Sequence, residues 1–127
     1  MTAATGAVSV TETPETITRL NRYTCWERVI DFDLISGDTT GAAVVPINGL
    51  LQKIIVKLPD MASAEGTTDV SLTDNGDNTI FSVTNLAESN TTLYSVSEPL
   101  VEEVNVILGF TNPAASVADV TVTLRGV

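Results

Sequence analysis

Apolar and polar residues alternate along this chain with a period of two, the pattern of β-strands that have one face in a core and the other in water. Near the end of the sequence, Val120, Val122 and Leu124 alternate with polar residues from Asp119 to Arg125. Threonine and valine, which favour strands, are abundant. No segment shows the competing 3.6-residue period of an amphipathic helix. The alternation therefore predicts an all-β fold.

The segment Leu50–Leu58 is a further predicted strand with a less regular pattern. Leu50 and Ile54 are expected on its inner face and Lys53 on its outer face. Gln52 is a polar residue in the inward phase, and so an exception to the alternation.

Turn-forming residues divide the sequence into short strands, which favours a β-sandwich or jelly roll over a parallel α/β fold. We predict an antiparallel sandwich or jelly roll of about eight strands with an extended N-terminal arm. The other predicted strands are Val8–Val10, Tyr23–Ile35, Ala42–Ile47, Thr68–Thr73, Thr79–Val83, Thr91–Val96 and Val104–Phe110.

Two connections are predicted to be hairpins. Asp74–Asn78 contains a glycine and two asparagines, which accept the positive φ of tight turns, and it lies between two predicted strands. Asn112-Pro113 lies between the last two predicted strands and favours a second hairpin.

A length of 127 residues predicts one domain. We expect residues 21–127 to form the sandwich and residues 1–20 to form an arm, because apolar residues in the arm are too few to form a core of their own. The arm is expected to order on a partner's surface, by adding a strand to a sheet edge. The candidate partner contacts are Val8, Val10, Pro14, Ile17 and Leu20 in the arm and Trp26 in the body. Trp26 has two open roles, as a core residue or as a binding contact.

Six basic residues against sixteen acidic ones give a formal net charge of −10. Such a surface repels nucleic-acid phosphates and anionic membranes, so we expect neither as a partner. No run of 18 or more apolar residues occurs. The first ten residues have no signal-peptide pattern, so synthesis and folding in a cytoplasm are expected.

The composition argues against an enzyme. Without histidine the chain cannot build a Ser-His-Asp triad, a Cys-His pair or a histidine-ligated zinc site. Gly37-Asp-Thr-Thr-Gly41 lacks the Lys-Ser/Thr end of a phosphate-binding loop, so no nucleotide cofactor is expected. Cys25 stands alone and is expected to be a small packing residue.

Asp31 and Asp33 lie two residues apart on the outer face of the predicted strand Tyr23–Ile35. Strand geometry spaces them by about 6.6–7 Å, which suits an inverting glycosidase or a cation with oxygen ligands. Nothing in the sequence brings a third carboxylate beside them. The expected role is a solvated outer face, and whether the pair binds an ion stays open.

Three segments together resemble a known group of proteins: Gly49-Leu-Leu-Gln-Lys-Ile-Ile-Val-Lys-Leu-Pro59, Thr68-Asp-Val-Ser-Leu-Thr-Asp-Asn-Gly-Asp-Asn-Thr-Ile-Phe81 and Asp119-Val-Thr-Val-Thr-Leu-Arg-Gly126. They resemble the small β-sandwich structural proteins of tailed bacteriophages, which are encoded among the head and head-to-tail genes. The resemblance is one of pattern and covers roughly residues 42–127.

Within that group the closest role is capsid decoration, or cement. The resemblance implies a non-enzymatic virion protein, commonly a homotrimer, that binds the major capsid protein on the capsid surface and stabilises the lattice. The alternatives are a tail, head-fibre or head-to-tail connector protein. A carbohydrate-binding module is an alternative from another class, and it would need Tyr23, Trp26 and Tyr94 to share an exposed face.

Overall fold

The computed structural model describes residues 8–13, 25–35, 37, 39–60, 67–111 and 118–127. These residues form nine strands. None of them belongs to a helix that could cross a membrane. The strands are β1 (Val8–Thr13), β2 (Trp26–Leu34), β3 (Thr40–Pro46), β4 (Gly49–Leu58), β5 (Thr67–Thr73), β6 (Thr79–Ala87), β7 (Asn90–Leu100), β8 (Glu103–Thr111) and β9 (Ala118–Gly126).

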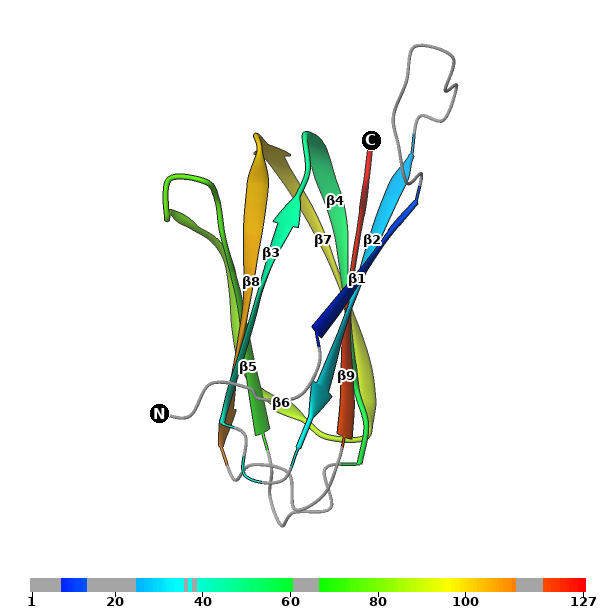
Figure 1. The fold of residues 1–127 in the computed structure, drawn as a ribbon, viewed down its shortest axis with the longest axis vertical. Coiled ribbons are helices and arrows are strands. Elements are labelled where there is room, and N and C mark those ends of the chain that lie inside the picture. Colours follow the sequence, from blue (N-terminus) through cyan, green and yellow to red (C-terminus); the bar gives the residue numbers. More distant parts are fainter. Residues whose placement is uncertain (1–7, 14–24, 36, 38, 61–66, 112–117) are drawn as a thin grey trace.

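The strands form two sheets that face each other as a sandwich (Figure 1). The five-stranded sheet has the order β1-β2-β9-β4-β7 and the four-stranded sheet the order β3-β8-β5-β6. Every pairing between neighbouring strands is antiparallel. The predicted all-β sandwich is therefore confirmed, with β1 and β7 at the edges of one sheet and β3 and β6 at the edges of the other.

The core lies between the sheets and is mainly aliphatic. The alternation predicted from the sequence holds on β2 and β9, where every second residue is buried and the residues between them are more exposed. The fully buried side chains include Ile30, Phe32, Leu34, Leu51, Ile54, Val70, Leu72, Val104, Val106, Leu108, Val120, Val122 and Leu124.

A β-bulge in β4 changes the predicted orientation of its first residues. The register with β9 shifts between Leu51 and Lys53, so Gln52 is an extra residue in β4 and is exposed. Leu51 is fully buried, whereas Leu50 is only half-buried. The prediction that Leu50 faces the core was wrong, because one inserted residue reverses the side-chain phase on one side of the bulge.

The predicted hairpin at Asp74–Asn78 is confirmed, since it joins the antiparallel pair β5 and β6. The positive φ lies at Asp77 (62°) and not at the glycine or the asparagines, so that part of the prediction was wrong. The carboxylate of Asp74 accepts hydrogen bonds from the backbone N–H groups of Gly76 and Asn78, both at 2.9 Å. An Asx-type turn of this kind closes the loop from within.

The predicted hairpin at Asn112-Pro113 was wrong. The strand before it, β8, pairs with β3 and β5 in one sheet, while β9 pairs with β2 and β4 in the other. The chain therefore passes from one sheet to the other between β8 and β9. Residues 112–117 themselves lie outside the described part of the chain.

The structure describes part of the expected N-terminal arm. Residues 8–13 form β1, which pairs antiparallel with β2 from Val8↔Phe32 to Thr13↔Glu27. This part of the arm is thus an edge strand of the domain's own sheet, a longer strand than the predicted Val8–Val10. The rest of residues 1–20 lies outside the described ranges.

Candidate functional site

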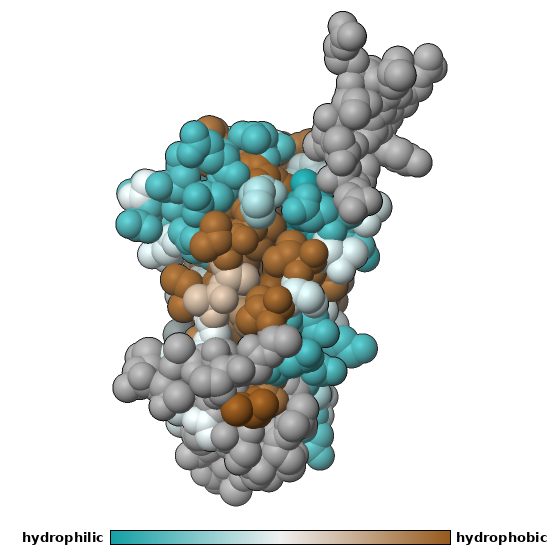
Figure 2. Space-filling view, in the orientation of Figure 1, coloured by the Kyte–Doolittle hydropathy of each residue, from teal (hydrophilic) through white to brown (hydrophobic). Residues whose placement is uncertain are grey.

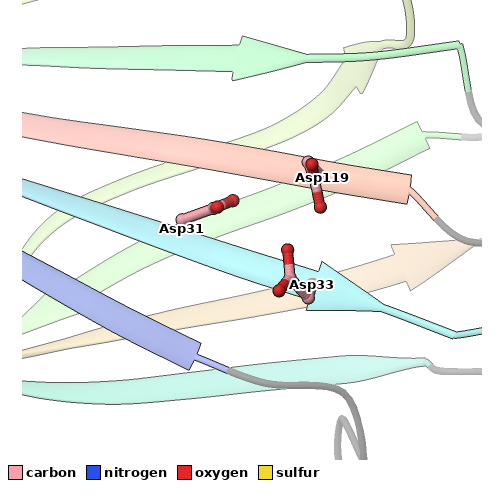
Figure 3. Close-up of side chains that lie close together, drawn as sticks. All are labelled: Asp31, Asp33 and Asp119. Atoms are coloured by element: carbon pink, nitrogen blue, oxygen red, sulfur yellow. The ribbon is translucent and has the colours of Figure 1, made fainter.

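Three carboxylates meet on the outer face of the five-stranded sheet. Asp31 and Asp33 extend from β2, and Asp119 is the register partner of Asp33 on β9. One oxygen atom from each residue lies within 4.8 Å of the others. Figure 3 shows Asp33 and Asp119 turned toward each other across the two strands, with Asp31 beside them. The sequence placed the first two on one face, but pairing of distant strands supplied the third.

The cluster makes two of its members harder to ionise. The pKa of Asp119 is raised by a hydrogen bond with Asp33, by loss of hydration, and by the negative charges of Asp31 and Asp33. Partial burial, and then the charge of Asp33, raise the pKa of Asp31. The Oδ1 atom of Asp31 is buried and has no hydrogen-bond partner within the described residues. Asp31 and Asp119 are therefore both less acidic than isolated aspartates.

The geometry limits what these carboxylates can do. Oxygen ligands suit hard cations such as Ca²⁺, which takes six to eight oxygen ligands, so three carboxylates would form part of a coordination shell. The oxygens are closer together than the about 6.5–9.5 Å of an inverting glycosidase. The cluster also lines neither of the two surface depressions described below. The arrangement therefore offers three negatively charged groups close together on one face of the sheet.

Trp26 is a core residue in this structure. Its side chain is only 5% exposed and packs in the hydrophobic core at one end of β2. Its indole Nε1 is buried without a hydrogen-bond partner among the described residues. The sequence left open whether Trp26 is a core residue or a binding contact, and in this structure it is a core residue. Around it lies a depression of about 540 Å³, lined by Thr13, Cys25, Trp26, Glu27, Gln52, Lys53, Arg125 and Gly126.

Arg28 is a buried cation that sequence reasoning missed. Its Nε lies 3.7 Å from Glu12 on β1 and donates a hydrogen bond to the Pro46 carbonyl on β3 at 3.5 Å. Its guanidinium carbon lies 5.8 Å from the centre of the Trp26 ring, within cation–π range. Arg28 occupies an inward position on β2, which the period-two pattern alone marks as unusual for a charge. It thus links β1 and β2 of the five-stranded sheet to β3 of the four-stranded sheet.

The predicted partner contacts fall into three groups. Val8 is 39% exposed on β1, and Val10 is half-buried against the core. Trp26 is buried, as described above. Pro14, Ile17 and Leu20 lie outside the described residues. The candidate contact residues of the arm that the structure describes, Val8 and Val10, therefore both lie on the edge strand β1.

The described aromatic residues form no exposed platform. Tyr94 is half-buried and packs edge to face with Phe81, with ring centres 5.0 Å apart. Trp26 is buried, and Tyr23 lies outside the described residues. The flat stacking surface of a carbohydrate-binding module is thus not built from Trp26 and Tyr94.

A second depression lies on the outer face of β3 and β8. It has a volume of about 320 Å³ and is lined by Ala42, Ala43, Val44, Thr73, Asp77, Asn105 and Ile107. Val44 is 58% and Ile107 40% exposed. The sequence predicted the strand here, but the exposure of these apolar side chains depends on which strand forms the sheet edge.

No protein-family model and no curated protein sequence matches the chain. Among solved structures it is similar to a chain of the Bacillus endospore appendages, disulfide-linked pili, with 15% identity, a TM-score of 0.48 and coverage of 87% of this chain and 95% of that one. The C-terminal family 22 carbohydrate-binding module of Clostridium thermocellum Xyn10B is 12% identical, with a TM-score of 0.41 and coverage of 98% and 85%.

An infectious bursal disease virus protein is 9% identical, with a TM-score of 0.38; the match covers 93% of this chain and 32% of the viral one. At these identities and TM-scores none of the three bears on function. The comparisons do not place the chain in the phage group that its sequence resembles.

Proposed function

We propose that this chain is a non-enzymatic virion protein that decorates a capsid and stabilises its lattice. The observation that carries the proposal is an apolar area on the side of the sandwich where β1 and β3 lie. Figure 2 shows apolar atoms gathered in the middle of this side, with hydrophilic atoms above them and to one side. On β1, Val8 is 39% exposed and Val10 is half-buried against the core.

Such an area needs an explanation in a chain with a formal net charge of −10. Exposed apolar patches rimmed by polar residues mark protein contacts, whereas isolated apolar residues do not. The two bordering strands are also sheet edges, which offer backbone groups to a partner strand. A capsid protein is the proposed partner because the sequence resembles phage head proteins.

Two features support a role without catalysis. The sequence contains no histidine, and the Asp31, Asp33 and Asp119 cluster lies on the outer face of the five-stranded sheet. General acid–base chemistry needs a titrating group that reaches a bound substrate, and the three carboxylates of this cluster line neither of the two depressions described above. The proposed location is the outer surface of the virion.

The proposal is tested by co-sedimentation with capsids assembled from the major capsid protein encoded near this gene. We expect the wild-type chain to pellet with capsids and Val8→Glu to bind at least tenfold more weakly. Thr11→Glu is the matched control, because Thr11 is exposed on the opposite face of the same strand. If the wild-type protein stays in the supernatant, or no capsid gene lies nearby, the proposal fails. Binding to xylan oligosaccharides instead would favour the carbohydrate-binding alternative.

A further inference from the structure

The edge strand β3 lacks the features that prevent strand pairing between molecules. Proteins protect sheet edges with charges, prolines, bulges or short strands. The sequence of β3, Thr-Gly-Ala-Ala-Val-Val-Pro, has no charge, and its proline is the last residue. Its seven pairs with β8 run without a register shift. β3 is therefore a regular strand with an unprotected edge.

The other three edge strands each have a protecting feature. β1 carries Glu12, and β7 carries Glu98 and Pro99 together with a register shift against β4. β6 shows two register shifts against β5 and a left-handed residue at Asn85, with φ of 59°. The contrast identifies β3 as the described edge best suited to accept another strand.

The direction of the backbone groups in β3 follows from its hydrogen bonds with β8. The N–H of Phe110 donates to the C=O of Thr39, and the N–H of Ile47 donates to the C=O of Glu102. Since antiparallel positions alternate, the odd-numbered residues of this segment direct their backbone groups toward β8. The even-numbered residues direct theirs away. Among the described residues, those of Ala42 and Val44 have no backbone partner.

We propose that β3 pairs antiparallel with β3 of a second copy of this chain, about a two-fold axis at Ala43. In this register Ala42 of each copy lies opposite Val44 of the other. The N–H and C=O groups of both residues then form four hydrogen bonds across the axis. Ala43 lies opposite itself at a non-hydrogen-bonded position. The two four-stranded sheets become one continuous sheet of eight strands.

The side chains of this edge suit a symmetric contact. A two-fold axis brings residues close to their own copies, so a charged strand would meet like charges, whereas β3 has none. On the outer face, Val44 of one copy would cover Ala42 of the other, and Ala42 already pairs with Ile107 on β8. The exposed apolar residues of the depression would then be buried.

A second copy is the proposed occupant for two reasons. β3 carries no charge, and its outward backbone groups match those of an identical antiparallel strand. With a formal net charge of −10 on each chain, two copies repel each other, and this repulsion is smallest when an uncharged surface forms the contact. The axis makes a dimer, which differs from the trimer expected from the sequence. The inference does not rest on capsid binding.

The first test is the molar mass in solution, by light scattering over a range of concentrations. We expect a mass that approaches twice the 13.4 kDa of the chain as the concentration rises. Val44→Lys and Val44→Pro should both remain monomeric, because the first adds a charge and the second removes an outward N–H without losing a bond to β8. Leu93→Lys is the matched control, since Leu93 on β7 is as exposed as Val44, at 57% against 58%; it should dimerise normally.

Circular dichroism would verify that each variant is folded. A wild-type protein that is monomeric at every concentration, or trimeric, overturns the proposal. So does a Leu93→Lys variant that loses the dimer while Val44→Lys keeps it, which would move the contact to another edge.

The second test concerns the register. In a Cys25→Ser background, Ala43→Cys places two thiols opposite each other, where Cα atoms are about 4.5 Å apart and a disulfide can form. We expect mild oxidation to give a covalent dimer. Ser95→Cys, exposed on β7, should stay monomeric. A dimer in solution that Ala43→Cys fails to cross-link would contradict the register, and equal cross-linking of both variants would show collision instead of pairing.

Discussion

Trp26 and Gly126 are register partners on β2 and β9, and the indole ring occupies the space that a side chain at position 126 would need. A Cβ atom built on Gly126 would lie 2.6 Å from Cζ2 of Trp26 and closer still to the carbonyl oxygen of Leu50. The buried tryptophan is thus accommodated by a glycine contributed from the other end of the sequence. Gly49, whose φ is +148°, borders the same ring.

Gly126→Ala is expected to destabilise the protein by about 1–3 kcal/mol or more, because neither the backbone at Leu50 nor the indole can move away cheaply. Gly109→Ala is the control, since a Cβ atom there meets only Asp69, at 4.0 Å. Urea unfolding of both variants measures the difference. Equal stability of the two variants would mean that the Trp26 end of the sandwich relaxes freely.

Leu124→Ala is expected to cost about 2–5 kcal/mol, the range for a buried leucine replaced by alanine. Leu124 is fully buried between the sheets, whereas Leu93 is 57% exposed. Leu93→Ala should therefore change the free energy of unfolding by less than about 0.5 kcal/mol. Denaturant titration of both proteins checks the assignment of the core, and a large loss in Leu93→Ala would contradict it.

Two ion pairs that involve β2 allow the effect of burial on stability to be distinguished from the effect of the distance between the charges. Arg125 and Glu27 are 2.7 Å apart but exposed, whereas Arg28 and Glu12 are 3.7 Å apart and the arginine side chain is 6% exposed. Glu12→Gln should cost about 1–3 kcal/mol, because it leaves a buried cation with weaker partners. Glu27→Gln should cost less than about 1 kcal/mol. If the shorter pair proves the more stabilising in thermal unfolding, distance outweighs burial here.

Asp119→Asn is expected to stabilise the protein at neutral pH. The folded-state pKa of Asp119 is raised, so the native state binds its proton more tightly than the unfolded chain does. Relative to asparagine, the wild-type residue loses stability as the pH rises from about 3.8 through the folded-state pKa. The advantage of the variant should therefore shrink at low pH. Melting curves from pH 3 to 7 test this, and a pH-independent difference would argue against charge repulsion.

Asp74→Asn should behave in the opposite way. Hydrogen bonds from Asn78 and Gly76 lower the pKa of Asp74 below its ordinary value of 3.8. A lowered pKa contributes stability above the unfolded-state value, and this contribution is lost as the pH falls through the folded-state pKa. The variant should be less stable than wild type at pH 7 and similar to it in strong acid. The same melting series measures it.

The local sequence pattern was sufficient to predict the strands and the turn at Asp74–Asn78. Side chains on β2 and β9 alternate between core and solvent because the backbone turns each successive residue to the other face, so hydrophobicity alone reveals the inner face. The Asp74 turn was predictable for a similar reason: its hydrogen bonds join residues within five positions of each other. The sequence by itself therefore determined the all-β class and the first hairpin.

Pairing between distant segments decided the rest. Asp119 joins Asp33 because β9 inserts between β2 and β4, and no local pattern reports strand order. Arg28 is buried because β1 and β3 approach the same end of β2, supplying Glu12 and the Pro46 carbonyl. The bulge at Gln52 and the exposed edge of β3 likewise depend on which strands are neighbours. Strand order depends on how all the strands of both sheets pack together, and this packing exists only in the folded chain.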